Sequence, residues 1–297
     1  LFYFACTFAE TILLMIGGMS FFDAICHAFA TMGTGGFSTK QDSIAYWDSP
    51  YIQYVIIVFM LIAASNFSLY YIALKGEVGK LLRDEEFRWY MIIAFSATLL
   101  IASGLYLAHW NTPETCFRDA LFQVTTIMTT TGFATANYLL WPTLLGLILF
   151  ILMFIGASAG STSGGMKVIR VLLLFKNSAA EMKRIIHPNA VINVKYNNKS
   201  VHPTIMNSVM GFSILFIIVF GIGSIIMALF TKDIATACSS VLTSMSNIGP
   251  GFGSIGPTEN FSQLNDFAKV FLALLMLIGR LEIFTVLVLF TKAFWKK

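Results

Sequence analysis

Three short segments of the sequence combine glycine with polar residues in a way that suits cation binding by backbone oxygens. Aligned on Gly36, Gly132 and Gly249, each segment has polar residues shortly before the glycine and a bulkier residue after it. Glycine permits the backbone geometry that turns successive carbonyl oxygens toward one axis, where they replace the hydration shell of a cation. Threonine hydroxyls add oxygen ligands that carry no charge. The predicted ion-binding residues are Thr34, Gly35, Gly36, Phe37, Thr130, Thr131, Gly132, Phe133, Asn247, Ile248, Gly249 and Pro250.

The same three segments end three similar stretches of sequence. Each stretch follows an apolar span and starts with a helix-like apolar run of about a dozen residues, which is too short to cross a bilayer. Asp23, Asp119 and Asp233 precede the glycines by similar distances and predict helix starts, because the N-terminus of a helix favours a carboxylate. Helices that enter the membrane from one side then point their negative C-terminal ends at its centre, which favours a cation. We therefore interpret the pattern as three copies of one unit: span, short re-entrant helix, loop, span.

A second interpretation of these glycines is that they are ordinary loop residues or close packing positions between helices, since glycine is common in transmembrane helices. Non-helical backbone at membrane depth is tolerated only where protein buries it or where it lines a water-filled cavity. One such loop would leave both interpretations open. Three aligned loops on one side of the chain favour a filter.

The composition is that of a membrane protein. Hydrophobic residues make up 57% of the 297 residues and charged residues 11%, against about 25% charged residues in ordinary globular domains, and the mean hydropathy is +0.77. A hydrocarbon core of about 30 Å needs about 20 apolar residues. Six stretches come near this length: 1–18, 51–74, 88–108, 143–175, 204–230 and 265–294. Because the first stretch starts at Leu1 with no initiator Met and no basic region, we expect a span and not a signal peptide, with further chain before it.

The basic residues predict how the chain crosses the membrane. Most of the 19 Lys and Arg residues fall in the segments 75–88 and 167–199 and in the tail after Thr291, which ends at Lys297. By the positive-inside rule, these segments and the C-terminus are cytoplasmic, and the three glycine loops face the opposite side. The opposite segments hold only Lys40, Arg118 and Lys232.

The segment 176–200 is the one substantial polar stretch. It is basic, and its helix is expected to end before Pro188, so it would suit either membrane lipid headgroups or a partner protein. Nucleic acid is not indicated, because the basic residues are spread over membrane-proximal loops. The sequence holds no nucleophile constellation, Walker loop or dinucleotide fingerprint, and it has no histidine spacing typical of a metal site. We therefore predict neither an enzyme nor a cofactor.

The hydrophobic run from 143 to 175 is interrupted by the segment 156–165, which is rich in glycine and hydroxyl side chains. This composition favours an unwound or flexible segment, and the segment should pass beneath the loop at Gly132. A helix interface built from small residues is the alternative. We predict that the segment gates the ion path through Gly156, Ser158, Gly160, Ser161, Thr162, Ser163, Gly164 and Gly165.

Two charged residues fall within predicted spans. Arg280 is near the middle of the last span, where a charged side chain is costly and indicates function by default. Glu282 lies about 200° further around a helix and is a poor same-face partner. Arg280 should therefore face the pore, either to repel cations there or to hydrogen-bond the carbonyls of the segment 156–165 in a structural role. We expect Glu10, in the first span, either against a buried polar partner or near the end of a truncated chain.

Five stretches, in order along the chain, match a known family. They are HAFATMGTGGFST at 27–39, TTTGFAT at 129–135, GASAGSTSGGMKVIR at 156–170, SNIGPGFG at 246–253 and GRLEIFTVLVLF at 279–290. Through these stretches, which together span almost the whole chain, the sequence resembles the Trk/Ktr/HKT superfamily of potassium transporters. It looks most like the TrkH- and KtrB-type membrane subunits of bacteria.

The resemblance implies an all-α membrane protein of repeated helix–pore helix–helix units with a pseudo-fourfold, potassium-channel-like architecture. It implies four such units, of which this sequence shows three, at 1–75, 76–200 and 201–297, with the first unit expected before Leu1. It also implies that the segment 156–165 lies under the filter as the gate, with Arg280 just below the filter. The family further implies a homodimer, a cytosolic nucleotide-binding regulatory subunit and a bacterial inner membrane location.

These features together predict the pore-forming subunit of a potassium uptake system in the plasma membrane, with the potassium ion as substrate and no cofactor in this chain. A sodium-permeable channel and a secondary transporter of another small solute are the alternatives. The choice between potassium and sodium, and between a channel and a coupled symporter, stays open because the first filter loop is not in this sequence. A structural subunit would have no reason to repeat the glycine loops.

Overall fold

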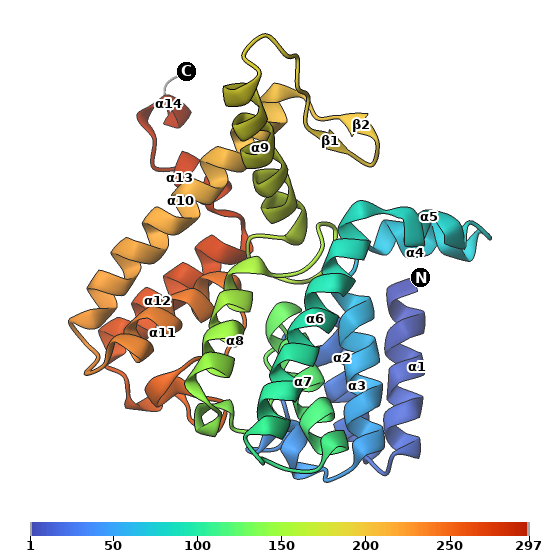
Figure 1. Cartoon of the computed structure of the whole chain (residues 1–297). Helices are drawn as coiled ribbons and strands as arrows, with labels where there is room; N and C mark the ends of the chain where they lie inside the picture. The colour runs from blue at the N-terminus through green and yellow to red at the C-terminus, as the bar shows by residue number, and fades with distance from the viewer. Residues whose placement is uncertain (1, 296–297) are drawn as a thin grey trace.

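The computed structural model describes residues 2–295. Leu1, Lys296 and Lys297, which the predicted first span and basic tail include, lie outside the described residues. The described chain is built from helices and one small hairpin of antiparallel strands (Figure 1). The helices and strands are α1 (Phe2–Ile16), α2 (Phe21–Met32), α3 (Pro50–Ala63), α4 (Phe67–Leu74), α5 (Val78–Arg83), α6 (Glu85–Leu107), α7 (Pro113–Met128), α8 (Thr143–Ile155), α9 (Val168–Ile186), β1 (Lys195–Tyr196), β2 (Lys199–Ser200), α10 (Pro203–Ala228), α11 (Ile234–Ser246), α12 (Asp266–Arg280), α13 (Ile283–Val288) and α14 (Lys292–Trp295).

The same three-helix arrangement occurs three times. In the first unit α2 packs against α1 and α3, in the second α7 packs against α6 and α8, and in the third α11 packs against α10 and α12. The helices α2, α7 and α11 are the predicted pore helices. The prediction of an all-α protein made of repeated helix–pore helix–helix units is confirmed, whereas the exact unit boundaries at residues 75 and 200 stay a prediction.

Two pore helices begin close to the predicted aspartates. Asp233 caps α11, and its carboxylate accepts a hydrogen bond from the backbone N–H of Thr236 at 2.7 Å. Asp23 lies in the first turn of α2, and the Ser20 side chain caps that helix by accepting from the Asp23 N–H at 3.1 Å. In both helices a side-chain oxygen satisfies one of the free amide groups of the first turn.

The predicted start of the second pore helix at Asp119 is wrong. Asp119 lies in the middle of α7, which begins at Pro113 after the cap residue Thr112. Proline at the first helical position already has a helical φ and lacks the amide that would be left unbonded, so it starts a helix readily. The helix therefore extends further toward its N-terminus than α2 and α11 do relative to their aspartates.

The second long helix of every unit is broken. Between α3 and α4 the chain turns by 97°, because Asn66 caps a new helix by accepting from the Ser68 N–H at 2.9 Å. Between α12 and α13 the chain turns at Glu282, which has φ 60°. The apolar stretches 51–74 and 265–294, each predicted to span the membrane, are thus each divided into separate helices. Arg280, expected near the middle of the last span, is the last residue of α12.

The third break, between α8 and α9, was predicted. Residues 156–167 separate the two helices and include left-handed glycines at Gly156 with φ 71° and Gly165 with φ 73°. We call residues 156–167 the intramembrane loop. By length and hydropathy, α6 and α10 are long enough to cross a membrane, and α3 with α4 qualifies as a bent pair. The helix α9 ends at Ile186, before Pro188, as expected.

The units contact each other through their pore helices. α7 packs against α3 of the first unit, and α11 packs against α8 of the second. Fully buried side chains such as Ile56, Met60, Phe122 and Phe133 fill the contact between the first two units. Close packing of this kind, and not exclusion from water, is what holds helices together in lipid. It fixes the ends of the three pore helices relative to one another.

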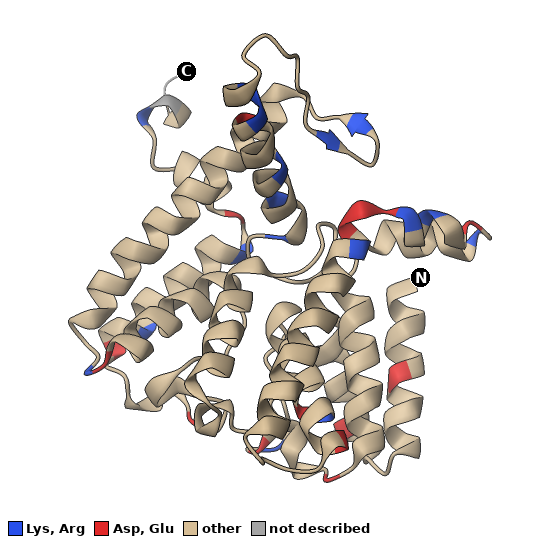
Figure 2. Ribbon diagram, in the orientation of Figure 1, with Lys and Arg blue, Asp and Glu red and all other residues tan. Residues whose placement is uncertain are grey.

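The charged residues divide the molecule into two faces. Lys and Arg gather on α5, on α9 and on the β1–β2 hairpin (Figure 2). We call this end the basic face, and the end where α2, α7 and α11 begin the filter face. The described part of the chain thus carries the charge asymmetry that the sequence indicated.

Candidate functional site

The three glycine loops share one backbone conformation. Shortly after each pore helix ends, one non-glycine residue adopts left-handed φ, and the aligned glycine two positions later does the same. A left-handed conformation costs a β-branched residue such as threonine roughly 1–2 kcal/mol, so surrounding contacts must hold the loops in place. The φ values are 50° at Thr34, 56° at Thr130, 55° at Asn247, 66° at Gly36, 89° at Gly132 and 105° at Gly249.

The backbone hydrogen bonds of the loops also repeat. In each loop an N–H reaches back five residues to a pore-helix carbonyl: Gly35 to Ala30 at 2.7 Å, Thr131 to Thr126 at 2.9 Å and Ile248 to Thr243 at 2.9 Å. This is the Schellman ending, in which a left-handed residue lets the chain satisfy the last helix carbonyls. Within the described chain, no hydrogen bond uses the carbonyl oxygens of residues 34–36, 130–132 or 247–249. Three consecutive carbonyl oxygens per loop therefore have no hydrogen-bond partner in the described chain.

The loops pack on one another in chain order. A Cβ atom on Gly36 would overlap the carbonyl oxygen of Thr131, and one on Gly132 would overlap that of Ile248. Only glycine allows backbones to approach so closely. Gly249 has no described atom within 4 Å of such a Cβ. The first, second and third loops are therefore neighbours around one region, which is open beside the third loop.

A cavity of about 520 Å³ lies at the filter face against all three loops. Its lining includes Gly36, Gly132 and Gly249. Two predicted filter residues have buried side chains: Phe133 lies beside the His27 ring, with ring centroids 5.7 Å apart, and Ile248 is 2% exposed. Phe37, in contrast, is 80% exposed. Among these residues the backbone, and not the side chain, is therefore what can contact an ion.

The chain that leaves the first loop is held against the start of α2. The Thr39 hydroxyl donates to Asp23 Oδ1 at 2.5 Å, and the Ser20 hydroxyl donates to Asp23 Oδ2 at 2.8 Å. These hydrogen bonds to the charged form hold the pKa of the partly exposed Asp23 carboxyl below its ordinary value, the one from Thr39 most strongly. His27 Nε2 lies 2.9 Å from Ser38 Oγ. Both ends of the first loop are thus attached to its own pore helix.

The intramembrane loop lies directly against the filter loops. The Thr34 hydroxyl is 2.9 Å from the Thr162 carbonyl oxygen, and the Gly164 N–H donates to Thr130 Oγ1 at 2.7 Å. A Cβ atom on Gly164 would overlap the carbonyl oxygen of Ser246, the last residue of α11. The segment expected beneath Gly132 therefore contacts the ends of all three pore-helix segments. Of the predicted gate residues, Thr162 and Gly164 make these contacts.

The first half of the intramembrane loop is fastened to the first unit and to α6. The Ser158 N–H donates to the Ala64 carbonyl at 3.1 Å, and the Thr162 hydroxyl lies 3.2 Å from the Ala63 carbonyl. The Ala159 N–H donates to Glu86 Oε1 at 2.6 Å. Glu86 is only 3% exposed. Sequence reasoning missed it, although a carboxylate at the edge of a predicted span was the available signal.

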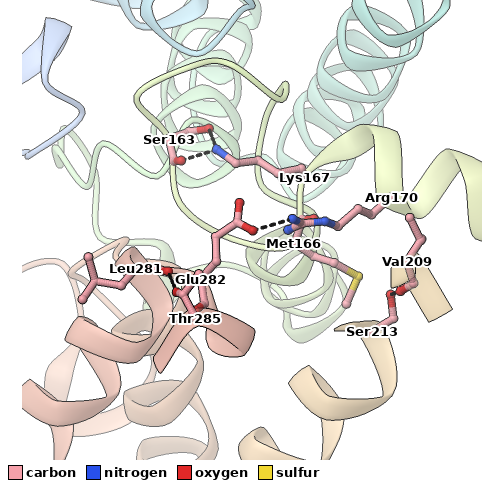
Figure 3. A network of polar contacts seen from close by, with 9 residues as sticks. All are labelled: Ser163, Met166, Lys167, Arg170, Val209, Ser213, Leu281, Glu282 and Thr285. Atoms are coloured by element: carbon pink, nitrogen blue, oxygen red, sulfur yellow. Dashed lines mark hydrogen bonds and ion pairs between the residues drawn. The ribbon is translucent and has the colours of Figure 1, made fainter. Parts of the chain in front are cut away.

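The second half is bordered by three basic residues. Arg280 Nη1 donates to the Thr162 carbonyl at 2.6 Å, which is one of the two roles expected for it. Lys167 Nζ turns back to the carbonyl and hydroxyl of Ser163, as Figure 3 shows. Arg170 Nη2 forms an ion pair with Glu282 Oε2 at 2.8 Å. The pair crosses from α9 to the break after α12, which agrees with the expectation that Glu282 does not pair with Arg280.

These groups surround a cavity of about 320 Å³ on the side of the intramembrane loop away from the filter. Lys167, Arg170 and Arg280 bring three positive charges to its wall, and Glu282 brings one negative charge. In a low-dielectric region such an excess repels cations that have no compensating ligand. Lys167, Arg170 and Glu282 were not among the predicted site residues. Lys167 and Arg170 fall in the basic segment 167–199, whose composition indicates membrane topology and no site.

Among the described residues, no group of three or more His, Cys, Asp or Glu side chains could hold a metal ion. The oxygen atoms that the three loops present without a hydrogen-bond partner in the described chain are backbone carbonyls. Neutral oxygens of this kind suit a monovalent cation that must bind and leave again.

Comparisons with known proteins agree with this geometry. The family model of TrkH, described as a cation transport protein, matches residues 1–297. The Trk system potassium uptake protein TrkH of Escherichia coli K12 is 40% identical over 299 residues, which cover 100% of this chain and 62% of that protein. TrkG of the same strain is 34% identical over 287 residues, covering 95% and 58%. The crystal structure of the potassium transporter TrkH from Vibrio parahaemolyticus matches with a TM-score of 0.93 and 39% identity over 99% of this chain and 64% of that one. The chain thus spans less than two thirds of these relatives.

Proposed function

This chain belongs to the TrkH family of cation transport proteins, and from that premise we propose that it forms filter and gate segments of a potassium uptake pathway in a membrane. The observation that carries the proposal is the repetition of three loops whose carbonyl oxygens, at residues 34–36, 130–132 and 247–249, accept no hydrogen bond within the described chain. Potassium is the proposed substrate because the related proteins are named for potassium uptake.

In the proposed mechanism, a hydrated cation enters the cavity at the filter face and exchanges water for loop carbonyls. The C-terminal ends of α2, α7 and α11 meet at these loops, and their partial negative charges favour the cation further. The glycines at Gly36, Gly132 and Gly249 allow the backbone conformation, and the close approach seen at Gly36 and Gly132 sets the separation of the loops. Gradients drive the flux, because the sequence holds no nucleotide-binding motif.

We further propose that the intramembrane loop is the gate. Its contacts with Thr34 and Thr130, and the hydrogen bond from Arg280 to the Thr162 carbonyl, support a closed position across the end of the filter. Opening then requires the loop to leave these partners. Because the positive charges of Lys167 and Arg280 lie on the far side of the loop, a cation that passed the filter would meet repulsion until they moved.

The charge asymmetry supports an orientation. With the basic face in the cytoplasm, the filter face and its cavity lie outside, as the positive-inside rule requires. We propose a multi-pass protein of a bacterial inner membrane with a cytoplasmic C-terminus, working as a homodimer. The basic face is the surface we propose for lipid headgroups and for a cytosolic nucleotide-binding regulatory subunit.

The test is cation flux through the full-length protein reconstituted in liposomes, with potassium, rubidium and sodium measured separately. We expect potassium and rubidium to move faster than sodium. A Gly132→Ser variant should lose flux, because the added side chain overlaps the Ile248 carbonyl, whereas Gly221→Ala in α10 has open space around the added methyl and should not. Wild-type protein that moves no cation would overturn the proposal.

A further inference from the structure

The start of α6 carries three consecutive acids, Asp84, Glu85 and Glu86, which the proposed ion pathway does not use. We call them the acidic turn. Asp84 is the cap residue of α6 and accepts from the Phe87 N–H at 2.9 Å. Successive residues of a helix point about 100° apart, so the three side chains have different partners. Glu85 forms an ion pair with Lys176 of α9, Asp84 contacts the β1–β2 hairpin and Glu86 contacts the intramembrane loop.

The tip of the β1–β2 hairpin is bonded to the acidic turn. Asn197 and Asn198 form this tip with left-handed φ values of 46° and 63°. The Asn197 side chain accepts from the Glu85 N–H at 2.9 Å through Oδ1 and donates to Asp84 Oδ2 at 2.7 Å through Nδ2. The first N–H groups of a helix have no partner within that helix. Asn197 therefore supplies an acceptor that α6 lacks, and it also orients the cap residue of α6.

The base of the hairpin is held by other contacts. Val194 is buried in an apolar cluster that includes Leu173 of α9 and Met206 of α10. Across the base, the Val201 N–H donates to the Val194 carbonyl at 2.9 Å. The hairpin tip can therefore lose its hydrogen bonds to α6 while the base stays packed against α9 and α10.

On its other side the acidic turn contacts the intramembrane loop. Glu86 is 3% exposed, and its Oε1 accepts from the Ala159 N–H at 2.6 Å. The preceding N–H, that of Ser158, donates to the Ala64 carbonyl at 3.1 Å. The first half of the loop is thus held between the first unit and α6. Because Glu86 is two positions from Asp84, less than one helical turn away, the contacts with the hairpin and with the loop share one turn of backbone.

We propose that the contact between Asn197 and the acidic turn keeps the intramembrane loop in its closed position, and that loss of this contact favours opening. With Asn197 in place, the start of α6 is fixed and Glu86 holds the Ala159 N–H. Without it, the turn that carries Glu86 loses an acceptor for its N–H groups and holds the loop less firmly. Asn197 and Glu86 are thus positioning residues for the gate, a role that rests on the proposed function. A partner on the basic face that binds the released hairpin tip more tightly than the bonded one would favour the open gate.

The first comparison is between Asn197→Gly and Asn198→Gly in the full-length protein in liposomes. Glycine adopts left-handed φ readily, so neither substitution strains the tip. Asn198 is the matched control because it is exposed and its side chain makes no hydrogen bond within residues 2–295. Initial rubidium uptake should rise about two- to tenfold in Asn197→Gly, the effect of losing one net hydrogen bond. Uptake by Asn198→Gly should stay within about twofold of the wild type.

The second comparison tests whether Asn197 acts through Glu86. Glu86→Gln keeps a side-chain oxygen that can accept from the Ala159 N–H, and its uptake should stay within about twofold of the wild type. Glu86→Met keeps the approximate volume without an acceptor and should raise uptake about as much as Asn197→Gly does. Adding Asn197→Gly to Glu86→Met should raise uptake no further, because the connection is already broken.

Hydrogen–deuterium exchange provides a measurement that does not depend on transport. Exchange of the amides of residues 156–167 should become faster in Asn197→Gly and not in Asn198→Gly, because a loop that is held less firmly opens more often. Exchange can be recorded on protein that moves no cation. Faster exchange without a rise in uptake would support the hold on the loop and refute the gate, so the two failures are distinguishable.

Three outcomes would overturn the inference. Unchanged exchange and uptake in Asn197→Gly would mean that the hairpin tip does not hold the loop. Equal rises in Asn197→Gly and Asn198→Gly would mean that only the flexibility of the tip matters. Additive rises from Asn197→Gly and Glu86→Met in the double variant would mean that the two residues act by separate routes.

Discussion

A single methyl group on Gly164 tests whether the intramembrane loop closes the pathway. Its N–H donates to Thr130 at 2.7 Å, and a Cβ atom added to it would overlap the carbonyl oxygen of Ser246. Gly164 is not among the glycines with left-handed φ, so alanine fits its backbone conformation. The obstacle in Gly164→Ala is therefore the overlap of the methyl with the Ser246 carbonyl, which is backbone and cannot rotate away.

The expected size follows from this overlap. Overpacking a tight site costs roughly 1–3 kcal/mol, and a free energy of that size shifts a two-state equilibrium by about 5- to 150-fold. The methyl penalises only the position in which the loop contacts α11. The loop should therefore leave this position more often, and rubidium uptake into liposomes should rise by a factor in that range, up to the point where the gate is open most of the time.

The assay compares initial rubidium uptake per reconstituted protein in wild type, Gly164→Ala and Gly221→Ala. Gly221 lies in α10, where an added Cβ would have no atom within 4 Å, so the control receives the same substitution without the overlap. Unchanged or lower uptake in Gly164→Ala, with the protein folded and the control normal, would refute the view that the contact with Ser246 belongs to the closed state.

Three further results are expected. Thr130→Val removes the acceptor of the buried Gly164 N–H and should destabilise the protein by about 1–3 kcal/mol, seen as a lower Tm, whereas Thr130→Ser should not; equal Tm values for the two variants would contradict this. Glu282→Gln breaks the ion pair with Arg170, and because the Glu282 side chain is half exposed, that pair contributes at most about 1 kcal/mol. Uptake by this variant should therefore rise by no more than about fivefold, and the rise should be smaller in high salt. A rise larger than that of Gly164→Ala would contradict this expectation. The pKa of Asp23 is lowered in the folded protein, so ionised Asp23 stabilises the fold at a pH above the ordinary Asp pKa of about 3.9, and this contribution is lost as the pH falls through the lowered pKa of the folded protein. Asp23→Asn should therefore flatten the acid side of the curve of Tm against pH. An unchanged curve would contradict this role of Asp23.

The sequence was informative wherever the backbone itself imposes a residue type. Left-handed turns and close backbone approaches require glycine, so Gly36 and Gly132 identified the loops before their positions in space were known. The same holds for the break before α9, where the segment 156–165 replaces apolar residues with glycine and serine. At these positions the backbone conformation that the tertiary structure needs also selects glycine, so the residue type in the sequence reveals the structure.

The sequence was uninformative wherever the structure depends on contacts between distant segments. The breaks after α3 and after α12 contain neither glycine nor proline. The Arg170–Glu282 pair joins residues 112 positions apart, and no local spacing predicts such a pair. The pore helix α7 begins before its predicted start because Thr112 and Pro113 act locally, a signal that was present and was outweighed by alignment with Asp119.

The intramembrane loop also has a consequence for how the protein is made. Its partners come from both sides of it in the chain: Ala63 and Ala64 precede it, and Ser246 and Arg280 follow it. A polypeptide that is inserted from its N-terminus must therefore hold residues 156–167 without part of their final contacts until α11 and α12 have entered the membrane. The intramembrane loop therefore completes its contacts only after α12, near the end of the described chain, has been inserted.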